Sequence, residues 1–191
     1  MKNALVQGEL EEAQNQARWL AEHEAHGDLP PGWEPYFEAM QSQARKVLAA
    51  QDTTEAAIGT ARVAGTCGSC HSAMEAKVRF GFEAPPPSEL DPEDPAHHAW
   101  AALRMWDALV SRSDSLWRRG VAVLSRARVT PPIRNPPAEG SDLHQALVSF
   151  RSMVAAAEVA DAAGSRGEVF GHYLGSCNHC HTLVEMELAS H

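Results

Sequence analysis

GTCGSCHSAM, residues 65–74, places two cysteines three positions apart and a histidine directly after the second. GSCNHCHTLV, residues 175–184, repeats this arrangement. On an α-helix, residues i, i+3 and i+4 lie on one face, so Cys67, Cys70 and His71 would stand together. The two stretches contain all four cysteines of the chain, which leaves none for a long-range disulfide. The chemistry of the chain is therefore expected at these two motifs.

Cys-x-x-Cys-His is the attachment signature of a c-type haem. The two thiols of such a motif form thioether bonds with the vinyl groups of the haem, and the histidine is the proximal ligand of the iron. The sequence thus predicts two covalently bound haem c groups. The predicted attachment residues are Cys67, Cys70, Cys177 and Cys180, and the predicted proximal iron ligands are His71 and His181.

Two other uses of paired cysteines stay open. The pairs could share a structural zinc ion, but they lie 110 residues apart (177 minus 67). A redox dithiol would be expected in a βαβ context, and the chain shows no strand-like alternation of apolar and polar residues.

Charge and hydropathy narrow the class of partner. The 191 residues carry a net charge of −9 at pH 7, which argues against nucleic acid and anionic lipid as partners. No apolar run approaches the length of a membrane span, so no transmembrane segment is predicted. The opening residues, MKNALVQGELEEAQ, lack the basic, apolar and small-residue regions of a signal peptide.

The chain also reads as an internal repeat. A shift of 110 residues aligns VAGTCGSCHSAME with YLGSCNHCHTLVE without a gap, and a shift of 104 aligns MKNALV with MWDALV. The difference between these two shifts arises in the predicted loops, where TPPIRNPPAEGSD is longer than HGDLPPG. Apolar residues recur at helical spacing in each half. We predict an all-α fold of two tandem helical bundles, residues 1–84 and 96–191, joined by a linker at residues 85–95.

Each predicted bundle has apolar stripes that we expect to form its core. A helix at roughly residues 94–112 opens the second half, and Ser113 or Asp114 is the expected N-cap of the next helix. The principal stripes are Leu10, Ala13, Ala17 and Leu20; Phe37, Met40, Ala44 and Val47; Trp117, Val121 and Leu124; and Leu143, Leu147, Phe150, Val154 and Ala157.

A four-helix bundle with Cys-x-x-Cys-His close to its C-terminus resembles the class II c-type cytochromes, of the cytochrome c prime type. The second half, about residues 94–191, resembles this family throughout, whereas the first half resembles only its last three helices. The family tends to have an aromatic and a basic residue just after the motif. This chain departs from that pattern, with Met74 and Glu75 in one half and Val184 and Glu185 in the other.

The resemblance implies a periplasmic location, because haem attachment by this motif takes place outside the cytoplasm. Met1 aligns with Met105, which lies inside the first predicted helix of the second half. We therefore expect an export signal upstream of Met1, together with residues that complete the first helix of the first half.

In the resembled family, the first helix of a bundle supplies the distal side of the haem. For the second haem this implies His98 as the distal iron ligand, with Met105 or a vacant sixth site as alternatives. His98 shares a helix face with Trp106 and is expected to point inward, whereas His97 shares a face with Arg104 and is expected to meet water. Met105 lies two turns beyond His98, or about 10 Å, so the two side chains cannot bind one iron.

The first haem has no predicted distal ligand, because the position that matches His98 would precede Met1. The nearest histidines, His23 and His26, lie at a helix end in AEHEAHGD and are expected at the surface. His179 lies between the cysteines of the second motif and is expected to face away from the haem.

A haem with two strong ligands does not readily bind substrate, which favours electron transfer over catalysis. We expect a periplasmic electron carrier, not an enzyme, whose acidic surface suits a basic docking patch on redox partner proteins. The alternative is a haem protein that binds NO or CO at a vacant sixth site. A peroxidase would need a distal base beside an arginine, and Arg104 is expected on the opposite face. The resemblance also implies a homodimer through the first two helices, unless the two halves pair with each other.

Overall fold

The computed structural model describes most of the chain and shows only helices there, which confirms the predicted all-α class. None of the described helices is long and apolar enough to cross a membrane. The predicted linker lies outside the described residues, which are 1–24, 29–78, 80, 96–127, 136–161 and 164–189, with the backbone alone for 186–189. The helices are α1 Lys2–Val6, α2 Leu10–Glu22, α3 Glu34–Ala49, α4 Thr53–Ala73, α5 Ala96–Ser111, α6 Asp114–Leu124, α7 Asp142–Val159 and α8 Ser165–Ala189.

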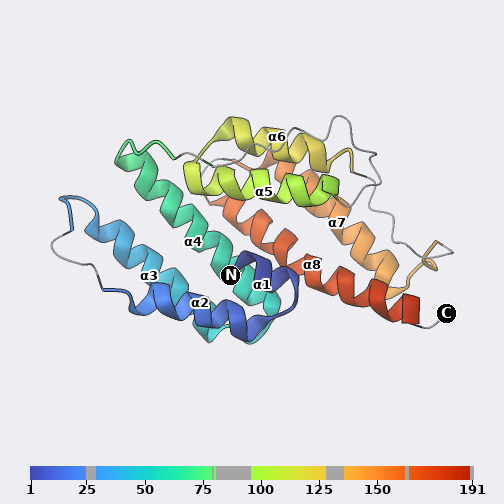
Figure 1. Ribbon diagram of the computed structural model, residues 1–191. Helices are drawn as coiled ribbons and strands as arrows, with labels where there is room; N and C mark the ends of the chain where they lie inside the picture. Colours follow the sequence, from blue (N-terminus) through green and yellow to red (C-terminus); the bar gives the residue numbers. More distant parts are fainter. Residues whose placement is uncertain (25–28, 79, 81–95, 128–135, 162–163, 190–191) are drawn as a thin grey trace.

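The helices that carry the two motifs, α4 and α8, pack directly against each other. Figure 1 shows α2 and α3 beside α4, α7 beside α8, and α5 and α6 along one side of the α4–α8 pair. The two halves of the chain therefore pair with each other.

Glycines allow α4 and α8 to approach closely. A Cβ atom added to Gly171 of α8 would lie 2.6 Å from Ile58 Cα in α4, and one added to Gly175 would lie 3.0 Å from Thr54 Cα. These glycines are four residues apart, so they lie on the same face of α8. Because glycine has only a hydrogen atom in place of a side chain, the backbones of α4 and α8 come into contact at these two positions.

Side chains at the helix starts explain several of the boundaries. Asp52 caps α4 by accepting a hydrogen bond from the Glu55 amide at 2.8 Å. Ser113 caps α6 by accepting from the Leu116 amide at 3.3 Å, which confirms one of the two predicted N-caps. Each cap satisfies an amide that has no partner within its own helix.

The internal repeat is visible in the helix boundaries. The second helix of each half begins at Leu10 and at Asp114, a shift of 104 (114 minus 10). The third helix of each half ends at Ala49 and at Val159, a shift of 110 (159 minus 49). These are the two shifts at which the sequence aligns with itself.

The turn after the first helix of each half is repeated as well. Gly8 and Arg112 occupy matching positions (112 minus 8 is 104), and both have left-handed backbones, with φ of 78° and 50°. Glycine adopts this conformation without strain, whereas arginine does not. The matching turn hydrogen bonds are Glu9 N–H to Ala4 O at 2.9 Å and Ser113 N–H to Ala108 O at 3.1 Å.

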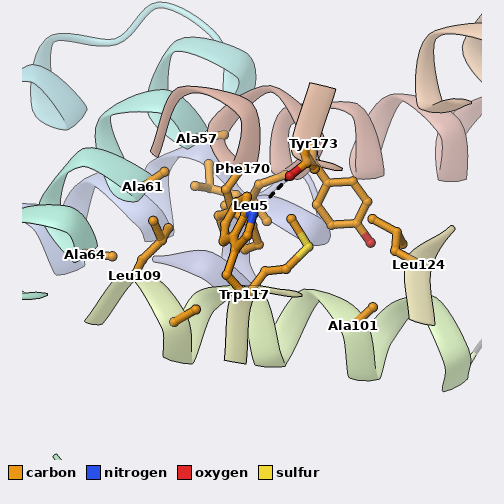
Figure 2. Close-up of a cluster of buried hydrophobic side chains, with 14 of the residues drawn as sticks. Leu5, Ala57, Ala61, Ala64, Ala101, Leu109, Trp117, Leu124, Phe170 and Tyr173 are labelled. Atoms are coloured by element: carbon orange, nitrogen blue, oxygen red, sulfur yellow. Dashed lines mark hydrogen bonds between the residues drawn. The ribbon is translucent and has the colours of Figure 1, made fainter. Parts of the chain in front are cut away.

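One hydrophobic core runs through both halves of the chain (Figure 2). Leu5 of α1, Trp117 of α6 and Phe170 of α8 belong to the same buried cluster, and each exposes at most 1% of its surface. Several predicted stripe residues are buried in it, among them Ala13, Ala17, Val47, Leu124 and Ala157. The division of the fold into two tandem bundles stays a prediction, because the described halves share this core.

Candidate functional site

The first motif occupies the last two turns of α4, and the second lies in the C-terminal half of α8. Both motifs are therefore helical, as their predicted chemistry requires. Cys67, Cys70 and His71 are all half-buried. None of the four cysteines forms a disulfide.

His71 is held by a backbone carbonyl of α5. Its Nδ1 atom lies 2.8 Å from the carbonyl oxygen of Val110. A carbonyl only accepts hydrogen bonds, so Nδ1 must carry the proton and donate, which leaves a lone pair on Nε2. Histidines that ligate a metal commonly donate their other ring N–H to a carbonyl in this way. This tautomer of His71 leaves Nε2 as the ring atom that could bind a metal.

An apolar group from three helices surrounds Cys67. It consists of side chains that lie between α2, α3 and α4, some fully buried and some only half-buried. A mostly apolar surface of this kind suits a porphyrin ring. The members of this Cys67 group are Ala21, Ala44 and Val63, with Met1, Leu20, Met40 and Leu48 packed around them.

Cys177 packs against the common core, which contains the counterparts of three residues of the Cys67 group. The shifts of 104 and 110 relate the pairs Leu20 and Leu124, Met40 and Phe150, and Val63 and Tyr173. Leu124, Phe150 and Tyr173 all belong to the core against which Cys177 packs. The aromatic rings of Phe150 and Tyr173 lie next to each other, with 6.1 Å between their centroids.

The thiols are not activated for redox chemistry. Burial, with a smaller effect from the neighbouring cysteine, raises the pKa of Cys177 to about 12. Burial likewise raises the pKa of Cys67 and of Cys180. Redox-active and nucleophilic cysteines rely on a lowered pKa, so this environment disfavours a redox dithiol.

The described residues also give no support for a shared zinc ion. They contain no group of three or more His, Cys, Asp or Glu side chains placed to hold one metal ion. A structural zinc needs four such ligands. A c-type haem places a different demand on the chain, because its thiols bind the porphyrin and a single histidine per motif binds the iron.

His179 and His181 are both exposed on α8. Between the two cysteines of this motif, Asn178 contacts the turn after α1. A Cβ atom added to Gly8 would lie 2.5 Å from Asn178 Oδ1. The second motif therefore lies against the first helix of the first half.

His98, the predicted distal ligand of the second haem, lies beside α8. Its carbonyl accepts a hydrogen bond from the Tyr173 hydroxyl at 3.2 Å, and its side chain is half-buried. Tyr173 is one turn before Cys177, so the start of α5 meets α8 just ahead of the second motif. Ligation by His98 stays a prediction.

Met105, the alternative ligand, is fully buried where α5 meets α6. A Cβ atom added to Gly120 of α6 would lie 2.8 Å from Met105 Cγ. Met105 exposes 0% of its surface and belongs to the common core. Its side chain thus helps to pack α5 against α6.

The predicted solvent face of α5 is wrong. His97, which was expected to meet water, exposes 6% of its surface, and Arg104, which was expected on the same face, exposes 3%. Arg104 forms an ion pair of 2.6 Å with Asp107 and lies over the ring of Trp100 at 5.7 Å. The physical reason is that α5 packs on α4, α6 and α8, which together cover more than one of its faces.

The structure describes one of the two histidines that follow α2 in the sequence. His26 lies outside the described residues. His23 is half-buried instead of lying openly at the surface, and its ring centroid is 4.5 Å from that of Trp19 and 6.4 Å from that of Phe37. This aromatic stacking holds His23 at the end of α2.

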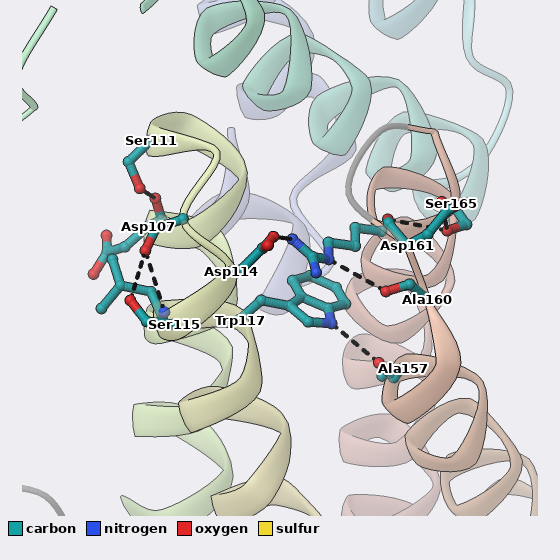
Figure 3. A network of polar contacts seen from close by, with 12 residues as sticks. Asp107, Ser111, Asp114, Ser115, Trp117, Ala157, Ala160, Asp161 and Ser165 are labelled. Atoms are coloured by element: carbon teal, nitrogen blue, oxygen red, sulfur yellow. Dashed lines mark hydrogen bonds and ion pairs between the residues drawn. The ribbon is translucent and has the colours of Figure 1, made fainter. Parts of the chain in front are cut away.

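A polar network at the α6–α7–α8 junction escaped the sequence analysis (Figure 3). The Trp117 indole N–H donates to the Ala157 carbonyl at 3.0 Å, and Arg166 Nη1 lies 2.6 Å from Asp114 Oδ1. The Arg166 guanidinium also lies 5.3 Å from the centre of the Trp117 ring. These partners are 40 and 52 residues apart, so no local sequence pattern predicts them.

The contact that holds His71 also escaped the sequence analysis. The sequence contained one signal for it, which was Gly68, a small residue between the two cysteines where the backbone of α5 approaches.

Comparison of the chain with protein-family models, with curated proteins and with solved structures finds no match. Its function is therefore inferred from the two motifs and from their surroundings.

Proposed function

We propose that the chain is a di-haem c-type cytochrome of the periplasm that transfers electrons between partner proteins. The observation that carries this proposal is the matched placement of the two motifs. Each lies on a helix of the central α4–α8 pair, and its first cysteine packs against an apolar cluster; three pairs of residues in the two clusters are related by the repeat shifts.

The residues present fit such a group. None of the four cysteines is used in a disulfide, and His71 offers its Nε2 lone pair because the Val110 carbonyl accepts from Nδ1. When bound, each haem supplies an iron that can take up and release one electron. The haems would be held by Cys67, Cys70 and His71 on α4, and by Cys177, Cys180 and His181 on α8.

The fold supports electron transfer because both motifs belong to one packed unit. The α4–α8 contact and the common core fix the two helices relative to each other. A close-packed interior resists rearrangement, and a carrier that changes little on oxidation and reduction exchanges electrons readily.

An acidic surface lies next to the second motif. Glu9, Glu11 and Glu12 are exposed at the start of α2, directly after Gly8, which contacts Asn178 between the cysteines. A basic docking patch on a redox partner would be attracted to these carboxylates. The net charge of −9 favours the same class of partner.

Absorption spectroscopy on protein matured in a host that exports it and attaches haem tests the proposal. We expect a pyridine haemochrome with two haems per chain and a sharp low-spin α band that carbon monoxide does not change. The double substitution Cys67→Ala/Cys70→Ala should leave one haem, and so should Cys177→Ala/Cys180→Ala. Protein without covalent haem would refute the proposal.

Binding of NO or CO is the second candidate function. It is favoured by the burial of Met105, whose side chain packs against Gly120 in the α5–α6 contact and is thereby engaged in the core. A high-spin spectrum that shifts when carbon monoxide is added would support this function for at least one haem.

A further inference from the structure

The first helix of each half contacts the motif of the other half. Near its C-terminal end, α5 of the second half packs on α4 at the first motif, and α1 of the first half packs on α8. At Gly68, between the cysteines of the first motif, an added Cβ atom would overlap the carbonyl oxygen of Leu109. The backbones of α4 and α5 therefore touch inside the motif itself.

The last turn of α5 supplies the acceptor for His71. Carbonyl groups in the last turn of a helix have no partner within that helix. The carbonyl of Val110, one residue before α5 ends at Ser111, accepts from His71 Nδ1 at 2.8 Å. This helix end also carries partial negative charge, which strengthens its attraction for an N–H donor.

The second motif has a matching contact with the end of the first helix of the other half. Asn178 matches Gly68 at the shift of 110, and Gly8 matches Arg112 at the shift of 104. Gly68 lies close to Arg112, whose Cγ would be 3.0 Å from an added Cβ atom, just as Asn178 lies close to Gly8. The two crossed contacts are thus related by the internal repeat.

We propose that the C-terminal turn of α5 is the positioning element for His71, so that the first haem centre is built from both halves of the chain. The Val110 carbonyl fixes the His71 tautomer and makes its Nε2 a stronger electron donor. The consequence for the iron rests on the proposed function: the second half of the chain lowers the reduction potential of the haem that the first half carries.

Two glycine substitutions in α4 test this proposal as a matched pair. Gly68→Ala pushes α5 away, because its Cβ would overlap the Leu109 carbonyl. Gly65→Ala is the control, because an added Cβ atom there meets nothing within 4 Å. Both residues lie in the same helix and within three positions of Cys67, so the change in helix propensity is alike.

The first readout is nitrogen-15 NMR of the His71 ring in the full-length chain, measured both without haem and with haem. We expect a proton on Nδ1 that is protected from exchange in the natural sequence and in Gly65→Ala. Gly68→Ala should lose this protection. A His71 proton on Nε2 in the natural sequence would overturn the proposal, and this measurement does not require that Gly68→Ala folds.

The second readout is the reduction potential of each haem in the loaded protein. Gly68→Ala should raise the potential of one haem and leave the other unchanged, whereas Gly65→Ala should change neither. Two bound haems with unchanged potentials in Gly68→Ala would overturn the positioning role and leave the proposed function intact. If no haem is bound in the natural sequence, the proposed function fails, and the NMR measurement without haem still decides whether α5 holds His71.

Discussion

The contact between α4 and α8 makes the stability of the chain sensitive to one methyl group. A Cβ atom at Gly171 would lie 2.6 Å from Ile58 Cα and 3.1 Å from Ile58 Cγ1. Carbon atoms in contact normally lie about 3.5–4.0 Å apart. The Gly171→Ala substitution therefore forces the two helices apart by about 1 Å at this point.

The expected cost follows from two opposing effects. Overpacking of a close-packed contact costs about 1–3 kcal/mol. Alanine in place of glycine within a helix regains about 0.5–1 kcal/mol. The net loss in the free energy of unfolding is then about 0–2.5 kcal/mol, centred near 1 kcal/mol. Because the α4–α8 contact joins the core of both halves, the loss should affect the whole fold.

Urea denaturation of the haem-free chain measures this effect. Gly171→Ala should lower the urea midpoint without changing the slope, since the surface exposed on unfolding stays the same. Gly65→Ala, whose Cβ meets nothing within 4 Å, should instead stabilise the chain by about 0.5–1 kcal/mol. The close contact would be refuted if Gly171→Ala stabilised the chain as much as Gly65→Ala does. A separate transition for one half would refute the common core.

Three further predictions concern named side chains. Trp117→Phe should cost about 1–3 kcal/mol in urea denaturation, because the buried Ala157 carbonyl loses its donor; an unchanged midpoint would contradict this. In the haem-free chain, burial raises the pKa of Cys177 from 9.0 to about 12, so the folded state keeps this proton while the unfolded state releases it. Stability should thus fall as the pH rises from about 9 towards 12, and less so in Cys177→Ala. The Arg166 guanidinium lowers the pKa of Asp114, so Asp114→Asn should lower the thermal midpoint at pH 7. The difference in thermal midpoint between the two proteins should vanish as the pH falls through the lowered pKa of Asp114. An equal difference at pH 7 and at a pH below this pKa would refute the ion pair.

Much of the local structure could be predicted from the sequence. The helical spacing of apolar residues gave the all-α class, and the shifts of 104 and 110 reappear in the helix boundaries. Ser113 was recognisable as an N-cap because its hydroxyl stands directly before an amphipathic segment. Such features depend on neighbours within a few positions, which a sequence pattern records.

The orientation of α5 could not be predicted in the same way. A helix covered by several neighbours has no single buried face, so periodicity alone could not separate His97 from His98. The neighbouring helices bury Arg104, and Asp107, three residues later, pairs with its charge there. That spacing was visible in the sequence and was a signal for a buried ion pair.

The crossed packing of the two halves was also beyond the sequence patterns. His71 and Val110 are 39 residues apart, and the repeat favoured contacts within each half instead of between halves. The glycines at 68 and 171 were the readable hints, because glycine inside a helix often marks a close backbone approach.

The central claim is that both Cys-x-x-Cys-His motifs carry covalent haem, and intact-mass spectrometry tests it most directly. The chain should be matured in a host that exports it and attaches haem. We predict the mass of the polypeptide plus two haem groups, and the loss of one group in Cys177→Ala/Cys180→Ala. A mass equal to that of the polypeptide alone would contradict the proposed function.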